Sequence, residues 1–162
     1  MTLRDATPDD ADAIVSIYNH YVATTTISFE EHAVTVAAMR QRIADVQQGG
    51  LPYLVALADG QVAAYAYATP WRARAAYRFS VESSVYVDAG HARLGLGSAL
   101  YAALMARLRA AGRHLVVGGI ALPNDASIAL HEKMGFKKVA HFSEVGHKFA
   151  RWIDVGYWQL KL

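Results

Sequence analysis

The stretch from Val85 to Ser98 carries the clearest chemical signal in the chain. It reads as a β-rich run, then a basic, glycine-containing turn, then the start of an apolar helix pattern. The first N–H groups of a helix have no partner inside it, and the helix dipole adds positive charge there, so such a turn can bind phosphate oxygens. Gly95 and Gly97 would let a pyrophosphate approach the backbone. A turn or packing requirement is the alternative explanation for both glycines.

Two nucleotide-binding motifs do not fit this stretch. A P-loop ends in Gly-Lys-Ser/Thr, which is absent, and a dinucleotide fingerprint has a third glycine where this chain has Leu100. The stretch also follows three expected strands instead of opening a βαβ unit.

A cluster of arginines precedes this stretch. Arg72, Arg74 and Arg78 fall within seven residues, and Arg93 follows nearby. Arginine can bind a carboxylate or phosphinate through two parallel hydrogen bonds. The formal net charge of +2 is too small to indicate nucleic acid. The cluster therefore favours an anionic small ligand, with a solvated charged surface as the alternative.

The histidines form no pattern typical of a metal site. Apart from His131, they are His20, His32, His91, His114, His141 and His147, and none belongs to a His-x-x-x-His or His/carboxylate cluster. The chain has no cysteine, which excludes disulfides, thiolate metal sites and a covalent cysteine intermediate. We therefore expect no metal cofactor.

Periodicity and turn signals predict alternating strands and helices. The stripe Leu96, Leu100, Leu104 and Leu108 predicts a long helix after the glycine turn, and Asp59-Gly60 predicts a hairpin. The first expected elements are strand 3–6 and a helix capped by Thr7 that begins at Pro8 and carries Ile14, Ile17, Tyr18 and Tyr21 on one face. The others are helix 34–48 ended by Gly49-Gly50, strands 53–57, 62–67 and 80–87, helix 96–110, strand 115–117, helix 125–134, and strands 138–142 and 152–160. This order predicts one α/β sandwich domain, 1–162, with a mixed sheet.

The composition is that of an ordinary globular domain. The chain has 162 residues, of which 54% are apolar and 19% charged, enough to bury a sizeable core. Its first residues lack the apolar core of a signal peptide, and no apolar run approaches the ~18 residues needed to span a bilayer. We expect a cytoplasmic location and no membrane or nucleic acid partner.

The 85–98 stretch resembles the signature of the GNAT superfamily of N-acetyltransferases, Arg/Gln-x-x-Gly-x-Gly/Ala at a strand-to-helix turn. Ala92 stands at the Arg/Gln position, so that side-chain contact is missing, and we expect Arg93 to supply the charge. The run from Asn124 to Phe136 is similar to the family's Asn-x-x-Ser…Gly-Phe helix, although capping alone could explain Asn124 and Ser127. The resemblance implies a GNAT-type three-layer sandwich with a mixed, mostly antiparallel central sheet, and acetyl-CoA as co-substrate.

Nearly the whole chain is also similar to phosphinothricin acetyltransferases and the related methionine sulfoximine/sulfone acetyltransferases. The segments that carry this similarity are 24–26, 70–77, 81–87, 122–125 and 152–159. The resemblance implies a small-molecule amine substrate, an amino acid analogue acetylated by direct attack while both substrates are bound, and a homodimer. Another amine or peptide N-terminus, and a non-catalytic acyl-CoA sensor, are the alternatives.

The same resemblance implies roles for individual residues. Glu82 would be the base, since an ammonium must lose a proton before it attacks a thioester, and His131 would protonate the leaving thiolate. From the residues alone, a solvent-facing glutamate and a packed histidine remain open. The pantetheine arm would bind at Val85, Tyr86, Val87, Asn124 and Ser127, and the diphosphate at Arg93, Leu94, Gly95, Leu96, Gly97 and Ser98. The substrate would be recognised by Arg72, Arg74, Tyr77 and Phe29, with Trp71 and Phe79 as further pocket candidates.

Overall fold

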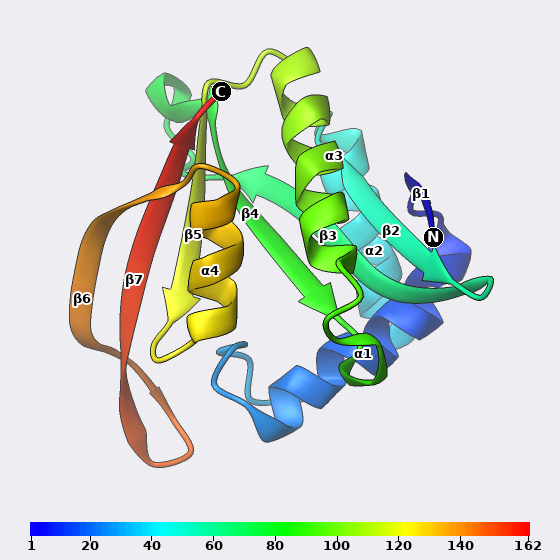
Figure 1. Ribbon diagram of the computed structural model, residues 1–162, viewed down its shortest axis with the longest axis horizontal. Helices are drawn as coiled ribbons and strands as arrows, with labels where there is room; N and C mark the ends of the chain where they lie inside the picture. Colours follow the sequence, from blue (N-terminus) through cyan, green and yellow to red (C-terminus); the bar gives the residue numbers. More distant parts are fainter.

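The predicted order of elements is confirmed by a computed structural model that describes residues 1–162, although several boundaries differ. Strand β4, Ser80–Val87, and helix α3, Leu96–Ala110, have the predicted bounds. The first helix begins at Ala11 and not at Pro8, because Pro8–Asp10 form a 3₁₀ turn. The other bounds are β1 Thr2–Asp5, α1 Ala11–Thr24, α2 Val36–Gln48, β2 Tyr53–Ala58, β3 Gln61–Pro70, β5 Leu115–Ala121, α4 Asp125–Lys133, β6 Lys137–Lys148 and β7 Arg151–Lys161 (Figure 1).

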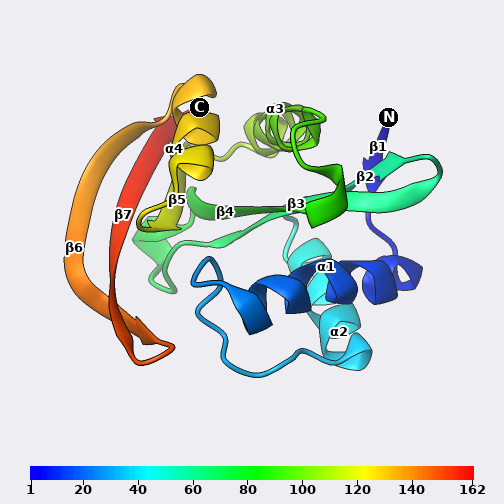
Figure 2. The ribbon, with the colours of Figure 1, turned by 60° about the horizontal axis from the view of Figure 1, so that its bottom comes forward.

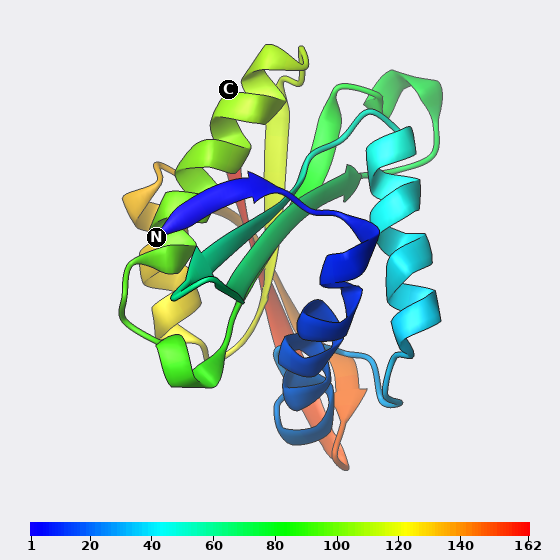
Figure 3. The same ribbon diagram turned by 90° about the vertical axis from the view of Figure 1, so that its right-hand side faces the viewer.

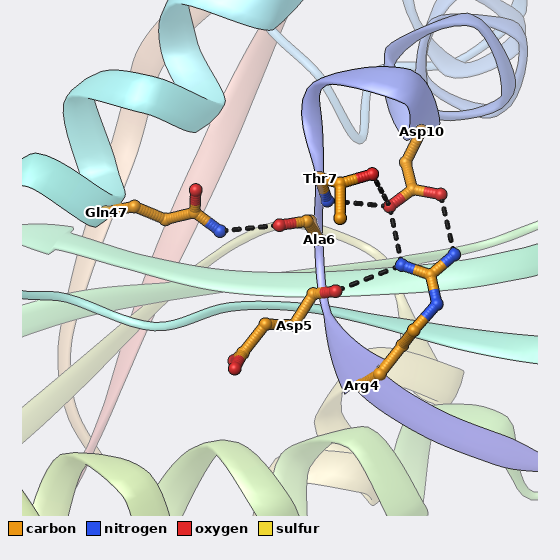
Figure 4. Close-up of polar contacts among 6 residues, drawn as sticks. All are labelled: Arg4, Asp5, Ala6, Thr7, Asp10 and Gln47. Atoms are coloured by element: carbon orange, nitrogen blue, oxygen red, sulfur yellow. Dashed lines mark hydrogen bonds and ion pairs between the residues drawn. The ribbon is translucent and has the colours of Figure 1, made fainter.

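Hydrogen bonds near the N-terminus attach β1 to the helices α1 and α2 (Figure 4). The buried Asp10 carboxylate accepts the Thr7 N–H at 2.8 Å and binds both terminal nitrogens of Arg4 at 2.7 and 2.8 Å. The hydrogen bonds from Arg4 lower the pKa of Asp10. Gln47, near the end of α2, donates to the Ala6 carbonyl at 2.8 Å. The start of α1 and the end of α2 are thus fixed to the same edge of the sheet.

The seven strands form one sheet in the order β1-β2-β3-β4-β5-β7-β6. All neighbouring strands are antiparallel except β4 and β5. The predicted hairpin joins β2 to β3, and both turn residues, Asp59 and Gly60, have positive φ angles of 51° and 78°. Strand β1 lies at one edge of the sheet, between α3 on one side and α2 on the other (Figure 3). The mixed, mostly antiparallel sheet is confirmed.

The sheet separates two layers of helices (Figure 2). Helices α1 and α2 cover one face, and α3 and α4 cover the other. The predicted stripe of α3 is buried in the core against the sheet, and its members are Leu96, Leu100, Leu104 and Leu108. No helix has the length and apolar character that a bilayer span requires.

The pairing of β4 with β5 stops after three residue pairs. Ser80–Glu82 pair with Leu115–Val117, and the two strands then diverge (Figure 1). On their outer edges, β4 stays paired with β3 as far as Val87, and β5 stays paired with β7 as far as Ala121. Backbone groups on the two inner edges therefore lack the strand partners that a continuous sheet would give them.

Candidate functional site

A cavity of about 60 Å³ lies where β4 and β5 diverge. Its lining comes from both strands, from α3 and α4 in one helical layer, and from the loop between α1 and α2. It consists of Ile27, Ser83, Ser84, Val85, Tyr86, Tyr101, Gly119, Asn124, Ser127 and His131. The fold thus brings together five residues that the sequence predicted for one site: Val85, Tyr86, Asn124, Ser127 and His131. Val87 is different, because its carbonyl accepts the Tyr21 hydroxyl.

The N-terminus of α3 follows the end of β4 after a short turn. Gly95 is the N-cap, with a left-handed φ of 77° that glycine adopts without strain. No side chain caps this helix, so the N–H groups of its first turn have no side-chain partner. Such groups at the positive end of a helix suit the phosphate oxygens that the sequence predicted here. The Leu96 side chain is buried, so only its backbone can contribute.

Two cationic side chains lie at this helix end. Arg93 is exposed and has a positive φ of 67°. Lys133, at the end of α4, donates to the Ser98 hydroxyl at 3.4 Å. The sequence analysis missed Lys133, because 35 residues separate it from Ser98 and nothing local marks it. The predicted diphosphate site thus has a cation from each of two elements, although Ala92 supplies none.

Gly97 is not required by the packing of the protein itself. A Cβ at this position would lie 3.5 Å from Leu130 and 3.7 Å from Val87, which are ordinary contact distances. Its φ angle is not in the left-handed region, unlike that of Gly95. The packing alternative therefore does not explain this glycine, whereas close approach of a ligand, as the sequence predicted, would.

Asn124 caps α4. Its Oδ1 accepts the Ser127 N–H at 3.1 Å, as the capping alternative expected. Its amide NH₂ is not used by this contact and belongs to a residue that lines the cavity, so it is available to donate to a ligand. Capping and ligand binding are therefore compatible roles for this side chain.

Glu82 lies at the point where β4 and β5 separate, because it is the last residue of β4 that pairs with β5. Its side chain is half-buried, and burial raises its pKa with no hydrogen bond or ion pair to offset the effect. Gly119 of β5 leaves room beside it, because a Cβ there would lie 3.4 Å from Oε1. A partly buried carboxylate with a raised pKa and no partner is suited to accept a proton.

His131 is buried and belongs to a chain of hydrogen bonds on the α3 side of the sheet. Its Nδ1 lies 2.7 Å from the Ser127 carbonyl, which can only accept, so Nδ1 carries the proton. Its Nε2 then accepts from the Tyr101 hydroxyl at 3.0 Å, and that hydroxyl lies 3.0 Å from the Ser83 hydroxyl. Burial lowers the pKa of His131, consistent with a neutral ring. The Tyr101 hydroxyl is the member of this chain that sequence reasoning missed, since its position beside the apolar stripe of α3 indicates only packing.

A second cavity of about 340 Å³ adjoins the first, and we call it the acceptor cavity. The two share Ile27 and Gly119 as lining residues. Glu82 is its one ionisable side chain besides a tyrosine, and the full lining is Ile27, Phe29, Glu82, Gly119, Ala121, Val145, Val155 and Tyr157. Phe29, predicted for the substrate pocket, lies here. The cavity can hold a small molecule with an amine directed at Glu82.

Arg72, Arg74 and Tyr77 were predicted to recognise the substrate, but none of them lines this cavity. The Arg72 guanidinium lies 5.0 Å from the Trp71 ring centroid, and that ring packs edge-on against Tyr157 of the acceptor cavity. Burial and the charge of Glu82 raise the pKa of Tyr157, while the charge of Arg72 opposes them. Arg72 also lines a separate cavity, where Arg74 lies with it. Tyr77 lies in an exposed 3₁₀ turn and lines neither.

Metal ligands are absent from this arrangement. The chain has no group of three or more histidine and carboxylate side chains placed to hold a metal ion. The groups of the chain itself that could act in a reaction at the site are Glu82, the Tyr101–His131 pair and the N-terminus of α3.

Comparison with known proteins gives a consistent picture. Residues 3–156 match the acetyltransferase (GNAT) domain. The chain is 44% identical to a phosphinothricin N-acetyltransferase of Streptomyces viridochromogenes, over 97% of this chain and 85% of that protein. It is 39% identical to an L-methionine sulfoximine/L-methionine sulfone acetyltransferase of Salmonella typhimurium, over 100% and 95%. A crystal structure of a phosphinothricin acetyltransferase from Sinorhizobium meliloti in complex with acetyl-CoA superposes with a TM-score of 0.96, 37% identity and coverage of 99% and 88%.

The raised pKa of Glu82 predicts a cost in stability. Because the folded protein binds this proton more tightly than the unfolded chain, stability falls as the pH rises from the ordinary glutamate pKa (~4.3) through the folded value. We expect Glu82→Gln to raise the melting temperature by about 1–4 °C at about pH 8 and to leave it unchanged below about pH 4. Calorimetry at both pH values checks this, with the exposed Glu144→Gln as control. A lower melting temperature than wild type at both pH values would contradict the prediction.

Proposed function

The chain belongs to the GNAT family of acetyltransferases, and we propose that it transfers the acetyl group of acetyl-CoA to the primary amine of an amino acid analogue of the phosphinothricin or methionine sulfoximine type. The observation that carries the proposal is the position of Glu82. Its unpartnered carboxylate lies at the divergence of β4 and β5 and lines the acceptor cavity. The names of the similar proteins support this choice of substrate class.

The residues along the gap between β4 and β5 fit acetyl-CoA. When bound, the cofactor supplies an acetyl group that is already activated as a thioester. The free N–H groups at the start of α3, with Arg93 and Lys133, would bind its diphosphate. The inner edge of β4 and the Asn124 amide would bind the pantetheine arm. Similarity to a structure solved with acetyl-CoA supports this assignment.

Glu82 acts as the general base in this proposal. An ammonium has no lone pair, so the acceptor must lose a proton before its nitrogen can attack. A carboxylate whose pKa is raised by burial holds that proton more readily than an exposed one does. The amine then attacks directly while both substrates are bound, with no covalent enzyme intermediate.

The sulfur of the departing coenzyme A must take up a proton, and the groups nearest to that task lie on the α3 side of the sheet. The Tyr101 hydroxyl lines the cavity between His131 Nε2, to which it donates, and the Ser83 hydroxyl. By turning its O–H from Nε2 to the sulfur it would protonate the thiolate, and the tyrosinate would then regain a proton from solvent. The Ser127 carbonyl fixes the orientation and tautomer of His131. We therefore keep His131 as an assisting residue that acts through Tyr101.

The acceptor cavity and Arg72 suit an amino acid analogue with an anionic end. The apolar walls can bind a short aliphatic chain, and the amine is directed to Glu82. Arg72 does not line the cavity, but its guanidinium lies over the Trp71 ring, which packs against Tyr157 of the cavity, and in this proposal it reaches the acceptor from there. A guanidinium there attracts a carboxylate, phosphinate or sulfoximine group and repels a polyamine.

Homodimer formation is part of the proposal, and an exposed apolar surface supports it. Strand β6 is an edge strand of the sheet. Together with its hairpin to β7 it carries five large apolar side chains that are more than half exposed: Val139, Phe142, Val145, Phe149 and Trp152, the last 67% exposed. Exposed apolar groups on an edge strand invite pairing with another chain. A second copy presenting the same surface would cover them.

Replacing the base should separate catalysis from cofactor binding. We expect Glu82→Gln to lower kcat by ~10²–10⁴, because a positioned base contributes about that much, with the Kd for acetyl-CoA within about twofold of wild type. Gly97→Asp should show the opposite pattern, with weak cofactor binding, because its carboxylate would repel phosphate. A coenzyme A release assay and calorimetric titration measure both constants. A kcat within about a factor of two of wild type would reject Glu82 as base.

The two arginines should differ in their effect on the acceptor. Arg72→Gln is expected to raise the KM for phosphinothricin or methionine sulfoximine by about tenfold or more, since charge-assisted hydrogen bonds are worth ~1.5–3 kcal/mol, with the KM for acetyl-CoA unchanged. Arg74→Gln is the matched control and should have a smaller effect. If neither analogue is acetylated, or a polyamine is the better substrate, the amino acid analogue proposal fails while the acetyltransferase remains.

The dimer proposal predicts a mass change. Wild type should sediment as a dimer, and Trp152→Asp should shift it toward the monomer by burying a charge at the interface. Analytical ultracentrifugation measures both masses. A wild-type protein that stays monomeric at micromolar concentration contradicts the proposal.

A further inference from the structure

Lys148 is a buried lysine without a carboxylate partner. It lies at the end of β6, only 1% exposed, and takes part in none of the ion pairs of the chain. Its Nζ donates to the Thr25 carbonyl at 2.8 Å and to the Ser28 carbonyl at 2.6 Å, and lies 5.0 Å from the Phe149 ring centroid. Burying an ammonium is costly, and an apolar side chain of similar length would avoid that cost. The two carbonyl contacts therefore call for a role beyond packing.

The two carbonyls belong to the loop between α1 and α2. Residues 25–31 form neither helix nor strand, and their other hydrogen bonds are mostly short-range, such as the Ile27 N–H to the Thr25 hydroxyl at 3.2 Å. Ile27 and Phe29 of this loop line the acceptor cavity and are 41% and 43% exposed. The loop is joined to α1 by the Ser28–Tyr18 hydroxyl pair at 2.8 Å and to α2 by the Glu30–Arg42 ion pair at 2.7 Å. Neither contact reaches β6, so the side of the loop that lines the cavity needs a further attachment to hold its side chains in place.

Strand β6 provides a second attachment two residues before Lys148. A Cβ on Gly146 would lie 2.5 Å from the Phe29 ring, so the ring rests on bare glycine backbone. Val145, the preceding residue, lines the acceptor cavity from the side of β6. The loop and the strand thus form one wall of the cavity, joined by an aromatic contact and by the Lys148 ammonium.

We infer that Lys148 is a positioning residue that fixes the 25–31 loop to β6 and so sets the wall of the acceptor cavity that faces Glu82. The inference rests on the proposed function, because it assigns that cavity to the amine substrate. Lys148 does not line the cavity and touches no reacting group. Its loss should therefore weaken acceptor binding and leave both cofactor binding and the chemical step intact.

The absence of cysteine permits a matched pair of side chains at this position. Lys148→Cys is alkylated in denaturant and refolded: its thiolate displaces bromide from 2-bromoethylamine, which gives an ammonium of nearly the same reach as lysine. The same thiolate displaces bromide from 1-bromopropane, which gives an apolar side chain of equal heavy-atom number. Lys137→Cys, at an exposed lysine of the same strand, is treated identically as the control.

Two readouts decide the inference. Hydrogen exchange by mass spectrometry should show residues 25–31 at least about tenfold less protected in the propyl form than in the ammonium form, with α3 unchanged. The KM for phosphinothricin or methionine sulfoximine should rise about tenfold in the propyl form, since hydrogen bonds from a charged donor are lost. The kcat and the Kd for acetyl-CoA should stay within about twofold.

Equal hydrogen exchange and equal KM in the two forms would overturn the inference. Faster exchange throughout the chain in the propyl form would also overturn it, because Lys148 would then stabilise the whole fold and not the loop in particular. The Lys137 pair should show no difference in either readout, and a difference as large as at Lys148 would also overturn it. If wild type acetylates neither analogue, the proposed substrate fails, and the exchange comparison still decides whether Lys148 holds the loop.

Discussion

The early end of the β4–β5 pairing is the constraint on which the site depends. Neighbouring strands in a sheet satisfy each other's backbone groups, and in this chain that exchange stops at Glu82. The outer edges of both strands remain bound, β4 to β3 and β5 to β7, so the strands are held apart by their neighbours. The opening is therefore a property of the sheet. Helix α3 begins at the end of β4 and α4 follows β5, so both helix starts lie near it (Figure 1).

Successive side chains of β4 point to opposite faces of the sheet, which places Glu82 on one face and the contact with Tyr101 and His131 on the other. Glu82 lines the acceptor cavity, while Ser83, one residue later, faces α3 and hydrogen-bonds to Tyr101. Burial raises the pKa of Glu82 and lowers that of His131, so the two shifts bring the pKa values closer together, and it is position that separates the two groups. A single strand thus carries the Glu82 carboxylate on one face and, through Ser83, contacts the Tyr101–His131 pair on the other.

Local signals were sufficient for β4 and α3, because a strand, a glycine turn and an apolar stripe follow one another without interruption. They failed for β5 and β6. Gly118 and Gly119 carry no strand signal, yet β5 continues through them, and a Cβ on Gly118 would lie 2.6 Å from His131 Nε2. Strand β6 was predicted to end at 142, but it resumes beyond an irregularity between Phe142 and Gly146 that interrupts the alternation.

The family resemblance indicated Glu82 and His131, whose catalytic roles stay predictions. Nothing in the sequence indicated Tyr101, Lys133 or Lys148. Their contacts span 30, 35 and 123 residues of the sequence, and no local pattern can indicate contacts over such separations.

The 123-residue contact, between Lys148 and Thr25, joins two segments near opposite ends of the chain. Apart from Ile27, the proposed cofactor site comes from the stretch 80–133, while the acceptor cavity adds a wall from the 25–31 loop and from strands β6 and β7. In the proposed function, most residues that would set substrate range are thus encoded apart from most of those that would hold the cofactor. Divergence among descendants of one ancestor can alter the first without disturbing the second.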